Sequence, residues 1–146
     1  MPKTRCSLLN PTKKGGKVRE IKFRGKTLKG EWIYGYLMNM HSDDRLFIGT
    51  WKNIGGEATV KDELFFSYKE VDPKTVGQYT GLKDSKGVEI YEGDIINYSN
   101  GFKIYEVKWN NNSHEFKLHD RNQKHNMEII GNIYEHPELL PKTGKE

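Results

Sequence analysis

Hydrophobic residues recur at every second position over much of the chain, which is the period of a β-strand and not of a helix. No stretch of about 11 residues carries the pattern of an amphipathic helix. Only a short helix within 70–80 and a single helical turn at Pro137 are predicted. The predicted strands are 19–24, 31–38, 46–48, 64–68, 88–91, 95–98, 102–109, 115–119 and 127–134. Short strands at regular spacing predict a mainly β fold of the small barrel or roll kind, with minimal helix.

The strand over 31–38 is hydrophobic on both faces. One face carries Trp32, Tyr34, Tyr36 and Met38, and the other carries Ile33 and Leu37. Gly35 inside it suggests a bulge or a close backbone approach. A strand hydrophobic on both sides is either buried twice or covered by a partner. The pattern therefore predicts a homo-oligomer with 31–38 at or near the contact.

Glycine- and asparagine-rich clusters mark the turns. Gly25 and Gly30 are expected to bracket one turn, and Gly49 is expected to end the strand that begins at Leu46. Asn100-Gly101 predicts a type I′ hairpin turn. The cluster 83–87 is expected to separate an N-terminal β region, 18–82, from a C-terminal barrel, 83–146.

The composition indicates a folded domain despite its polarity. Hydrophobic residues make up 34% and the mean hydropathy is -0.85, but aromatic residues reach 12%. Disordered chains are poor in aromatic residues. The single cysteine, Cys6, excludes an internal disulfide framework and favours a reducing cytoplasm. A signal peptide and a membrane helix of about 18 apolar residues are not predicted.

Positive charge is concentrated at the start of the chain. Residues 1–30 hold ten Lys or Arg and one acid, whereas the other 116 residues hold fourteen Lys or Arg and nineteen acids. We predict that residues 1–17 are a disordered, dispensable basic tail. Two alternatives stay open: a nucleic-acid-binding arm, or a translated ribosome-binding site in which Val18 corresponds to the true start codon.

Three blocks of sequence carry a family resemblance. The segment 71–84 runs into 87–95, with 19–25 before it and 130–140 after it. Together they resemble the YopX-like family of phage and prophage proteins. The resemblance covers 19–140 and includes a motif made of Gly77, Gln78, Tyr79, Thr80, Gly81, Glu92, Gly93 and Asp94. It implies a phage or prophage origin, mostly in Gram-positive hosts, and an SH3-like barrel. It implies no activity, so no catalytic residue is carried over.

The motif residues are interpreted as structural more readily than as functional. Gly77 and Gly81 suit turns with positive φ, and Tyr79 suits burial. The alternative is a recognition loop that uses Gln78 and Thr80. Asp94 is expected to accept backbone N–H groups as in an Asx-turn. No metal site is predicted, because the histidines at 41, 114, 119, 125 and 136 lack convergent metal-ligand spacing. No catalytic or cofactor site is predicted either, because the sequence has no nucleophile–base constellation, no P-loop and no dinucleotide fingerprint.

Basic and aromatic residues interleave near the start of the folded region. Lys22, Arg24, Lys26 and Lys29 are therefore candidate nucleic-acid contacts, since charge can follow the phosphates while rings stack on bases. The plainer interpretation is a strand with its lysines in solvent. Two functions follow: a non-enzymatic module that binds a host or phage protein, which we favour, or a nucleic-acid-binding accessory protein in phage DNA or RNA metabolism.

Overall fold

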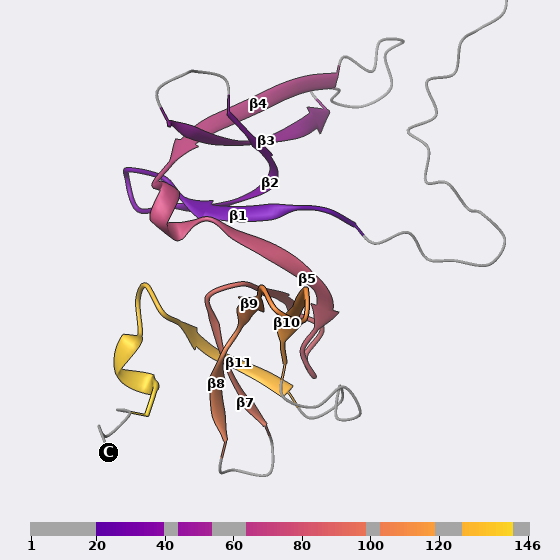
Figure 1. Ribbon diagram of the computed structural model, residues 1–146. Coiled ribbons are helices and arrows are strands. Elements are labelled where there is room, and N and C mark those ends of the chain that lie inside the picture. The colour runs from indigo at the N-terminus through magenta and orange to yellow at the C-terminus, as the bar shows by residue number, and fades with distance from the viewer. Residues whose placement is uncertain (1–19, 40–43, 54–63, 99–102, 119–126, 142–146) are drawn as a thin grey trace, which may run out of the picture.

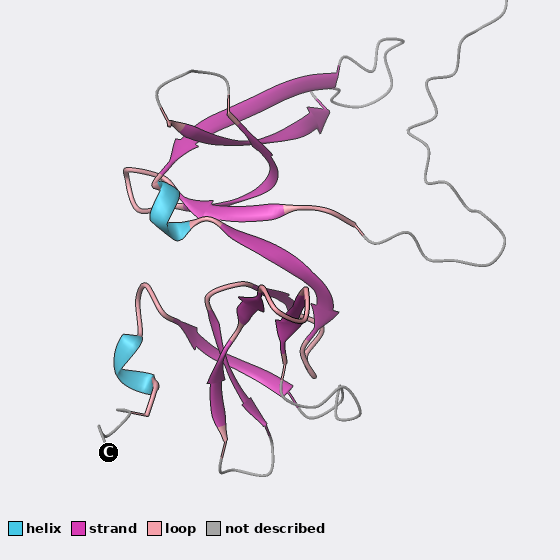
Figure 2. Cartoon of the chain, viewed as in Figure 1, coloured by secondary structure: helices cyan, strands magenta, loops and turns pink. Residues whose placement is uncertain are grey.

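The computed structural model describes residues 20–39, 44–53, 64–98, 103–118 and 127–141, and these residues are mainly β (Figures 1 and 2). The six-stranded sheet has the order β4-β3-β2-β1-β5-β6, the three-stranded sheet has the order β11-β7-β8, and β9 pairs with β10. All strand pairs are antiparallel. The predicted mainly β class is confirmed, while the SH3-like barrel stays a prediction.

The chain forms two lobes joined by one shared strand (Figure 1). The N-terminal lobe contains β1 (Phe23–Lys26), β2 (Trp32–Met38), β3 (Leu46–Asn53), β4 (Leu64–Val71) and the 3-10 turn η1 (Pro73–Thr75). The linking strand is β5 (Gly77–Lys83), which pairs with β1 on one side and β6 on the other. The C-terminal lobe contains β6 (Glu89–Tyr91), β7 (Asp94–Tyr98), β8 (Ile104–Glu106), β9 (Lys108–Asn110), β10 (Glu115–Lys117), β11 (Met127–Asn132) and η3 (Pro137–Leu139).

The sheet of the N-terminal lobe curls until its two ends meet. Thr27, just after β1, forms a bridge with Val71 at the end of β4. Ile48 and Val71 are buried on the inner side, where they are 2% and 1% exposed. A Cβ at Gly25 would lie 3.0 Å from Ile48, so glycine permits this close approach.

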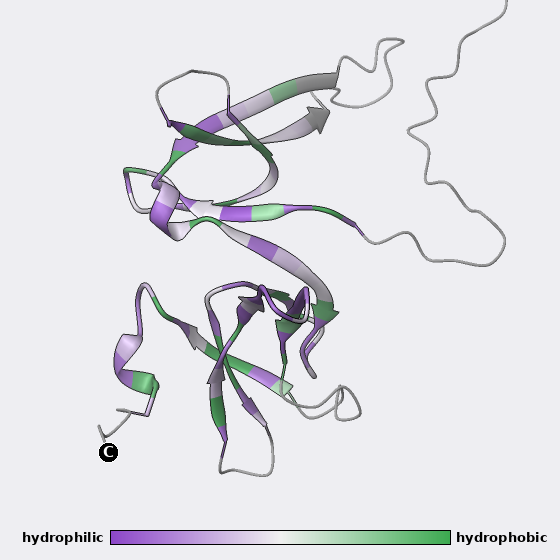
Figure 3. Ribbon diagram, viewed as in Figure 1, coloured by the Kyte–Doolittle hydropathy of each residue, from purple (hydrophilic) through white to green (hydrophobic). Residues whose placement is uncertain are grey.

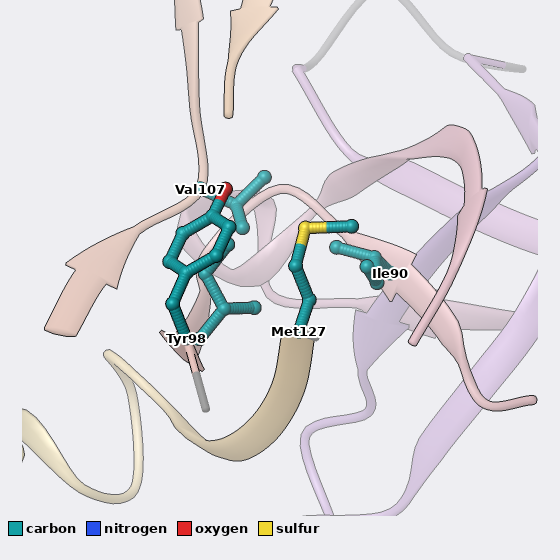
Figure 4. Close-up of a cluster of buried hydrophobic side chains, with 5 residues drawn as sticks. Ile90, Tyr98, Val107 and Met127 are labelled. Atoms are coloured by element: carbon teal, nitrogen blue, oxygen red, sulfur yellow. The ribbon is translucent and has the colours of Figure 1, made fainter. Parts of the chain in front are cut away.

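The C-terminal lobe has its own hydrophobic core. Ile90, Ile96, Tyr98, Val107 and Met127 form one buried cluster, and Figure 4 shows four of them converging from different segments. Figure 3 shows hydrophobic and hydrophilic segments interspersed along the strands of both lobes, as expected for strands with one inner and one outer side.

The glycine turns predicted at Gly25, Gly49 and Gly77 are wrong, and Gly77 begins β5 with no positive φ. Gly25 lies inside β1 and pairs with Ile33, and the turn begins at Thr27. Gly49 does not end a strand, because β3 continues to Asn53. A Cβ at Gly49 would lie 2.4 Å from the Phe66 ring. Gly25 and Gly49 leave room for a neighbouring side chain. Local sequence does not distinguish a glycine that makes such room from a glycine in a turn.

Two other predicted segments differ from those in the structure. The strand expected over 102–109 is two strands, because buried Val107 interrupts it and donates its N–H to the Asp94 carbonyl. The motif 77–81 lies in β5 and is not a loop. The turn at 83–87 joins β5 to β6 within a continuous sheet, and the division of the chain at that point stays a prediction.

Some predictions fall outside the described residues. They concern the tail 1–17 with Cys6, the Asn100-Gly101 turn, and the histidines at 41, 119 and 125. The short helices are placed as predicted: one follows Asp72, whose side chain caps it, and one begins at Pro137. Within the ranges given above, no helix has the length and apolar character needed to cross a membrane.

Candidate functional site

The outer side of the curled sheet in the N-terminal lobe carries exposed aromatic rings. Antiparallel partners share a face, and Tyr36 pairs with Gly49, which in turn pairs with Tyr68. Alternation along β2, β3 and β4 adds Tyr34, Met38, Phe47, Trp51 and Phe66 to the same face. We call these residues the aromatic face: Tyr34, Tyr36, Met38, Phe47, Trp51, Phe66 and Tyr68.

Rings of the aromatic face contact one another, and four of them remain open to solvent, whereas Phe47 is buried beneath its neighbours. The Trp51 and Phe66 centroids are 4.9 Å apart, and Tyr68 packs edge-on to Phe47 at 5.9 Å. Tyr34, Tyr36, Trp51 and Tyr68 are 49%, 55%, 52% and 51% exposed. Four large exposed rings on three adjacent strands form the most concentrated hydrophobic surface among the described residues.

The same side of the sheet is covered where β1 and the start of β2 lie. Trp32 packs against Tyr134 of the C-terminal lobe, with centroids 5.8 Å apart. Tyr34 lies at the boundary, because its ring meets Tyr91 edge-on at 5.4 Å. The sequence prediction that β2 is hydrophobic on both faces is therefore confirmed, and the C-terminal lobe covers only part of the outer face.

Three of the four candidate nucleic-acid contacts are engaged inside the chain. They alternate along β1 and its approach, and each meets a carboxylate of the C-terminal lobe. The ion pairs are Lys22–Glu89, Arg24–Asp94 and Lys26–Glu135, with N–O distances of 2.6, 2.6 and 2.8 Å. Lys29 is exposed in the turn after β1. These three cations neutralise acids within the molecule, which leaves them poorly suited to phosphate binding.

The central pair is buried. Arg24 is 7% exposed and Asp94 is 1% exposed. The guanidinium lies over the Trp32 ring at 4.8 Å and over the Tyr91 ring at 5.3 Å, an arrangement that its planar shape permits. Burial raises the pKa of Asp94 above its ordinary value, and the Arg24 charge opposes that rise.

The outer pairs are partly exposed and form small networks. Glu89 accepts hydrogen bonds from Lys22 at 2.6 Å and from the Tyr91 hydroxyl at 2.9 Å. Burial pushes the pKa of Glu89 upward, but these donors outweigh burial and hold the pKa below its ordinary value. Glu135 accepts from Lys26 and Trp32. Mainly through Lys26, the pKa of Glu135 falls to about 2.

The family motif builds the junction between the lobes. A Cβ at Gly77 would lie 2.4 Å from the Glu92 carbonyl oxygen, so only glycine lets the turn at 92–94 pack here. Gln78 accepts the Glu92 N–H through its carbonyl at 2.9 Å. Thr80 donates its hydroxyl to the Ile90 carbonyl at 2.9 Å. Gly81 has a φ of +84°, in the left-handed region that favours glycine.

Tyr79 and the 92–94 turn complete this junction. The Tyr79 ring is 5% exposed and lies 5.4 Å from the Tyr91 ring. Asp94 accepts the backbone N–H of Tyr91 at 2.8 Å, which matches the expected backbone role, although the donor precedes the turn. Gly93 has a φ of +85°, and a Cβ there would lie 2.9 Å from the Tyr134 ring. The motif residues contact other parts of the protein, as the structural interpretation predicts.

The two carboxylates of the 92–94 turn face different partners. Asp94 binds Arg24, while Glu92 accepts the Trp109 N–H at 3.4 Å. Within the described ranges, no group of three or more His, Cys, Asp or Glu residues is placed to hold a metal ion.

Sequence reasoning missed two sets of residues. Phe66, Tyr68 and Trp51 join the aromatic face, and the alternation along 46–53 and 64–71 carried that signal. The acids that pair with β1, Glu89 and Glu135, are separated from it by 67 and 109 positions. No local pattern indicates such distant partners.

Comparisons with known proteins agree with this architecture. The model of the YopX protein family matches residues 22–141. The crystal structure of protein EF1440 from Enterococcus faecalis is similar, with 28% sequence identity and a TM-score of 0.51. That alignment covers 84% of this chain and 99% of that chain. No curated protein matched.

Proposed function

The chain belongs to the YopX protein family, and we propose that it is a non-enzymatic protein-interaction module that self-associates through its aromatic face. A phage or prophage origin and the cytoplasm of a bacterial host are parts of the same proposal. The observation that carries it is the group of half-exposed rings on β2, β3 and β4. Solvent-exposed hydrophobic patches on proteins typically mark contacts with other molecules.

The charge of the aromatic face favours a protein partner over nucleic acid. Among the described side chains on this side of β2–β4, Glu70 is the only charged one, at the position opposite Phe47. Nucleic-acid binding relies on cations that neutralise phosphates. The cations of neighbouring β1 are already paired with acids of the C-terminal lobe.

We propose that the partner is a second copy of the same chain. Two aromatic faces that meet bring together mostly uncharged side chains, because the described residues of each face include one acid, Glu70, and no cation. Two copies of one chain usually form a dimer related by a two-fold axis. Tyrosine and tryptophan are also the residues that contribute most at protein interfaces.

Light scattering coupled to size exclusion tests the proposal. We expect a mass above the 17.0 kDa of one chain at micromolar concentration. Tyr36→Glu should shift the protein toward monomer, because the new carboxylate would be desolvated in the contact. Val88→Glu is the matched control, since Val88 is 51% exposed in the C-terminal lobe, outside the aromatic face.

Two outcomes contradict the proposal. One is a monomer mass across all concentrations, and the other is an oligomer that both variants leave intact. A parallel titration with single-stranded DNA and RNA at low and high salt tests the alternative. Tight, strongly salt-dependent binding would favour a nucleic-acid accessory protein.

A further inference from the structure

Strand β1 and its approach present a ladder of three cations to the other lobe. Lys22, Arg24 and Lys26 are spaced by two, so their side chains project from one face. Their partners come from three separate places in the C-terminal lobe: Glu89 on β6, Asp94 at the start of β7, and Glu135 after β11. One short strand thus contacts segments that span most of the C-terminal lobe.

The backbone connection between the lobes is slight by comparison. β1 and β5 share two registered residue pairs, Phe23 with Gln78 and Arg24 with Gly77. Each lobe also has its own buried residues. Ile48 and Val71 pack inside the N-terminal lobe, and the buried cluster shown in Figure 4 draws only on the C-terminal lobe.

We propose that β1 is an ionic clasp that fixes the orientation of the two lobes, with Arg24 and Asp94 as its central positioning residues. When the central pair is broken, the lobes keep their separate cores and change orientation about β5. This inference does not depend on self-association, because all of the clasp lies within one chain.

Burial explains why the central pair controls the clasp. The outer pairs have side chains 20–34% exposed, so water can replace either partner. The Arg24 and Asp94 side chains are only 8% and 2% exposed. Without Asp94, the Arg24 charge would be left buried and uncompensated. Opening the junction would hydrate that charge and also expose the Tyr91 ring, which packs against Tyr34 and Arg24, while the buried cluster of Figure 4 would stay intact because it lies within the C-terminal lobe.

The contacts of Arg24 would not be reproduced by another cation. Its guanidinium stacks on Trp32 and Tyr91 and donates to the Glu92 carbonyl at 3.3 Å. A lysine ammonium has no planar face and cannot make these contacts together with the Asp94 pair. Arg24 therefore binds the 92–94 turn in two ways, through the Glu92 backbone carbonyl and through the Asp94 carboxylate.

Pulsed electron spin resonance between spin labels in the two lobes tests the proposal. In a Cys6→Ser background, labels at Leu28→Cys and Lys117→Cys occupy exposed positions in different lobes. Labelled protein is diluted into unlabelled protein, so that only distances within one chain contribute. We expect one narrow distance distribution for this parent, and a distribution about twofold broader after Asp94→Asn.

Lys86→Gln is the matched control. It removes a cation from the exposed Lys86–Glu128 pair, which lies within the C-terminal lobe, and it should leave the distribution narrow. Methyl spectra of Ile48 and Ile96 report the two cores separately, and both should keep their native dispersion after Asp94→Asn.

If Asp94→Asn does not fold, the double variant Lys22→Gln, Lys26→Gln replaces it, and this variant should broaden the distribution by a smaller amount. An unchanged narrow distribution in a folded Asp94→Asn variant would overturn the clasp. So would an unfolded Asp94→Asn variant together with an unchanged distribution in the double variant.

Discussion

Tyr36 and Trp51 in the N-terminal lobe are 55% and 52% exposed, whereas Tyr91 and Tyr98 in the C-terminal lobe are 2% and 5% exposed. The residue types are alike and all four lie on or beside antiparallel strands. Tyr98 is buried in the cluster inside the C-terminal lobe, and Tyr91 is buried at the junction against Tyr34, Tyr79 and Arg24. The N-terminal lobe curls one sheet around the aliphatic residues Ile48 and Val71 and leaves Tyr36, Trp51 and Tyr68 exposed on the outer side.

Because of this difference, the buried rings contribute to folding stability and the exposed rings are available to bind a partner. A ring buried on folding contributes its transfer free energy to the folded state. A ring that stays exposed contributes little to folding and can still be buried later by a partner. We therefore expect substitutions of aromatic residues to have large effects on unfolding at the junction and in the C-terminal lobe, and small effects on the aromatic face.

The largest expected change in stability comes from truncating a buried ring, that of Tyr79. Tyr79→Ala should destabilise the protein by about 3–5 kcal/mol, as large aromatic truncations in cores do. The ring packs against Tyr91 and below the Lys22 ammonium, which is 5.1 Å from its centroid. Chemical denaturation measures the change. Tyr79→Phe, which keeps the ring, should retain most of the stability, and a wild-type midpoint for Tyr79→Ala would contradict the burial argument.

The next effect tests the junction between the lobes. Gly77→Ala should cost about 1–3 kcal/mol, because its Cβ would lie 2.4 Å from a backbone oxygen of the 92–94 turn. Thermal unfolding followed by circular dichroism measures the loss. An unchanged melting temperature would mean that the turn can move away freely, and would weaken the view that the motif fixes the junction.

A smaller effect depends on pH. The pKa of Glu135 is lowered to about 2, mainly by Lys26. A carboxyl whose pKa is lowered on folding contributes stability above its unfolded pKa, and loses it as pH falls through the folded value. We expect a contribution below about 1 kcal/mol, because the pair is about one-third exposed and screened.

Denaturation midpoints between pH 5 and pH 2 measure this contribution. The wild type should lose more stability over this range than Glu135→Gln. A parallel decline in the two proteins would show that the Lys26–Glu135 pair does not contribute to holding the lobes together.

The smallest expected change in stability comes from truncating an exposed ring, that of Tyr36. Tyr36→Ala should change the free energy of unfolding of the monomer by no more than about 0.5 kcal/mol, as for other exposed side chains. Denaturation at low protein concentration keeps self-association from contributing. A loss of several kcal/mol would show that the aromatic face belongs to the core and would remove the contrast between the lobes.

Several features could be predicted from particular residues. The alternation at Trp32, Tyr34 and Tyr36 against Ile33 and Leu37 gave the two faces of β2 correctly. Pro73 and Pro137 located the 3-10 turns η1 and η3. Glycines were harder to interpret, because Gly25 and Gly49 create room for distant side chains, whereas Gly81 and Gly93 supply positive φ values. Both uses look the same in a sequence.

The amino-acid sequence by itself determined the strand period, the mainly β class and the family. These properties depend on neighbours along the chain, since each side chain in a strand faces opposite to the next. Tertiary structure alone decided that Lys22, Arg24 and Lys26 pair with acids far away in sequence. It also decided that the rings of β2, β3 and β4 share one open face. Ion pairing and burial depend on which segments meet in space, and the pattern along one segment does not encode which distant segment it will meet.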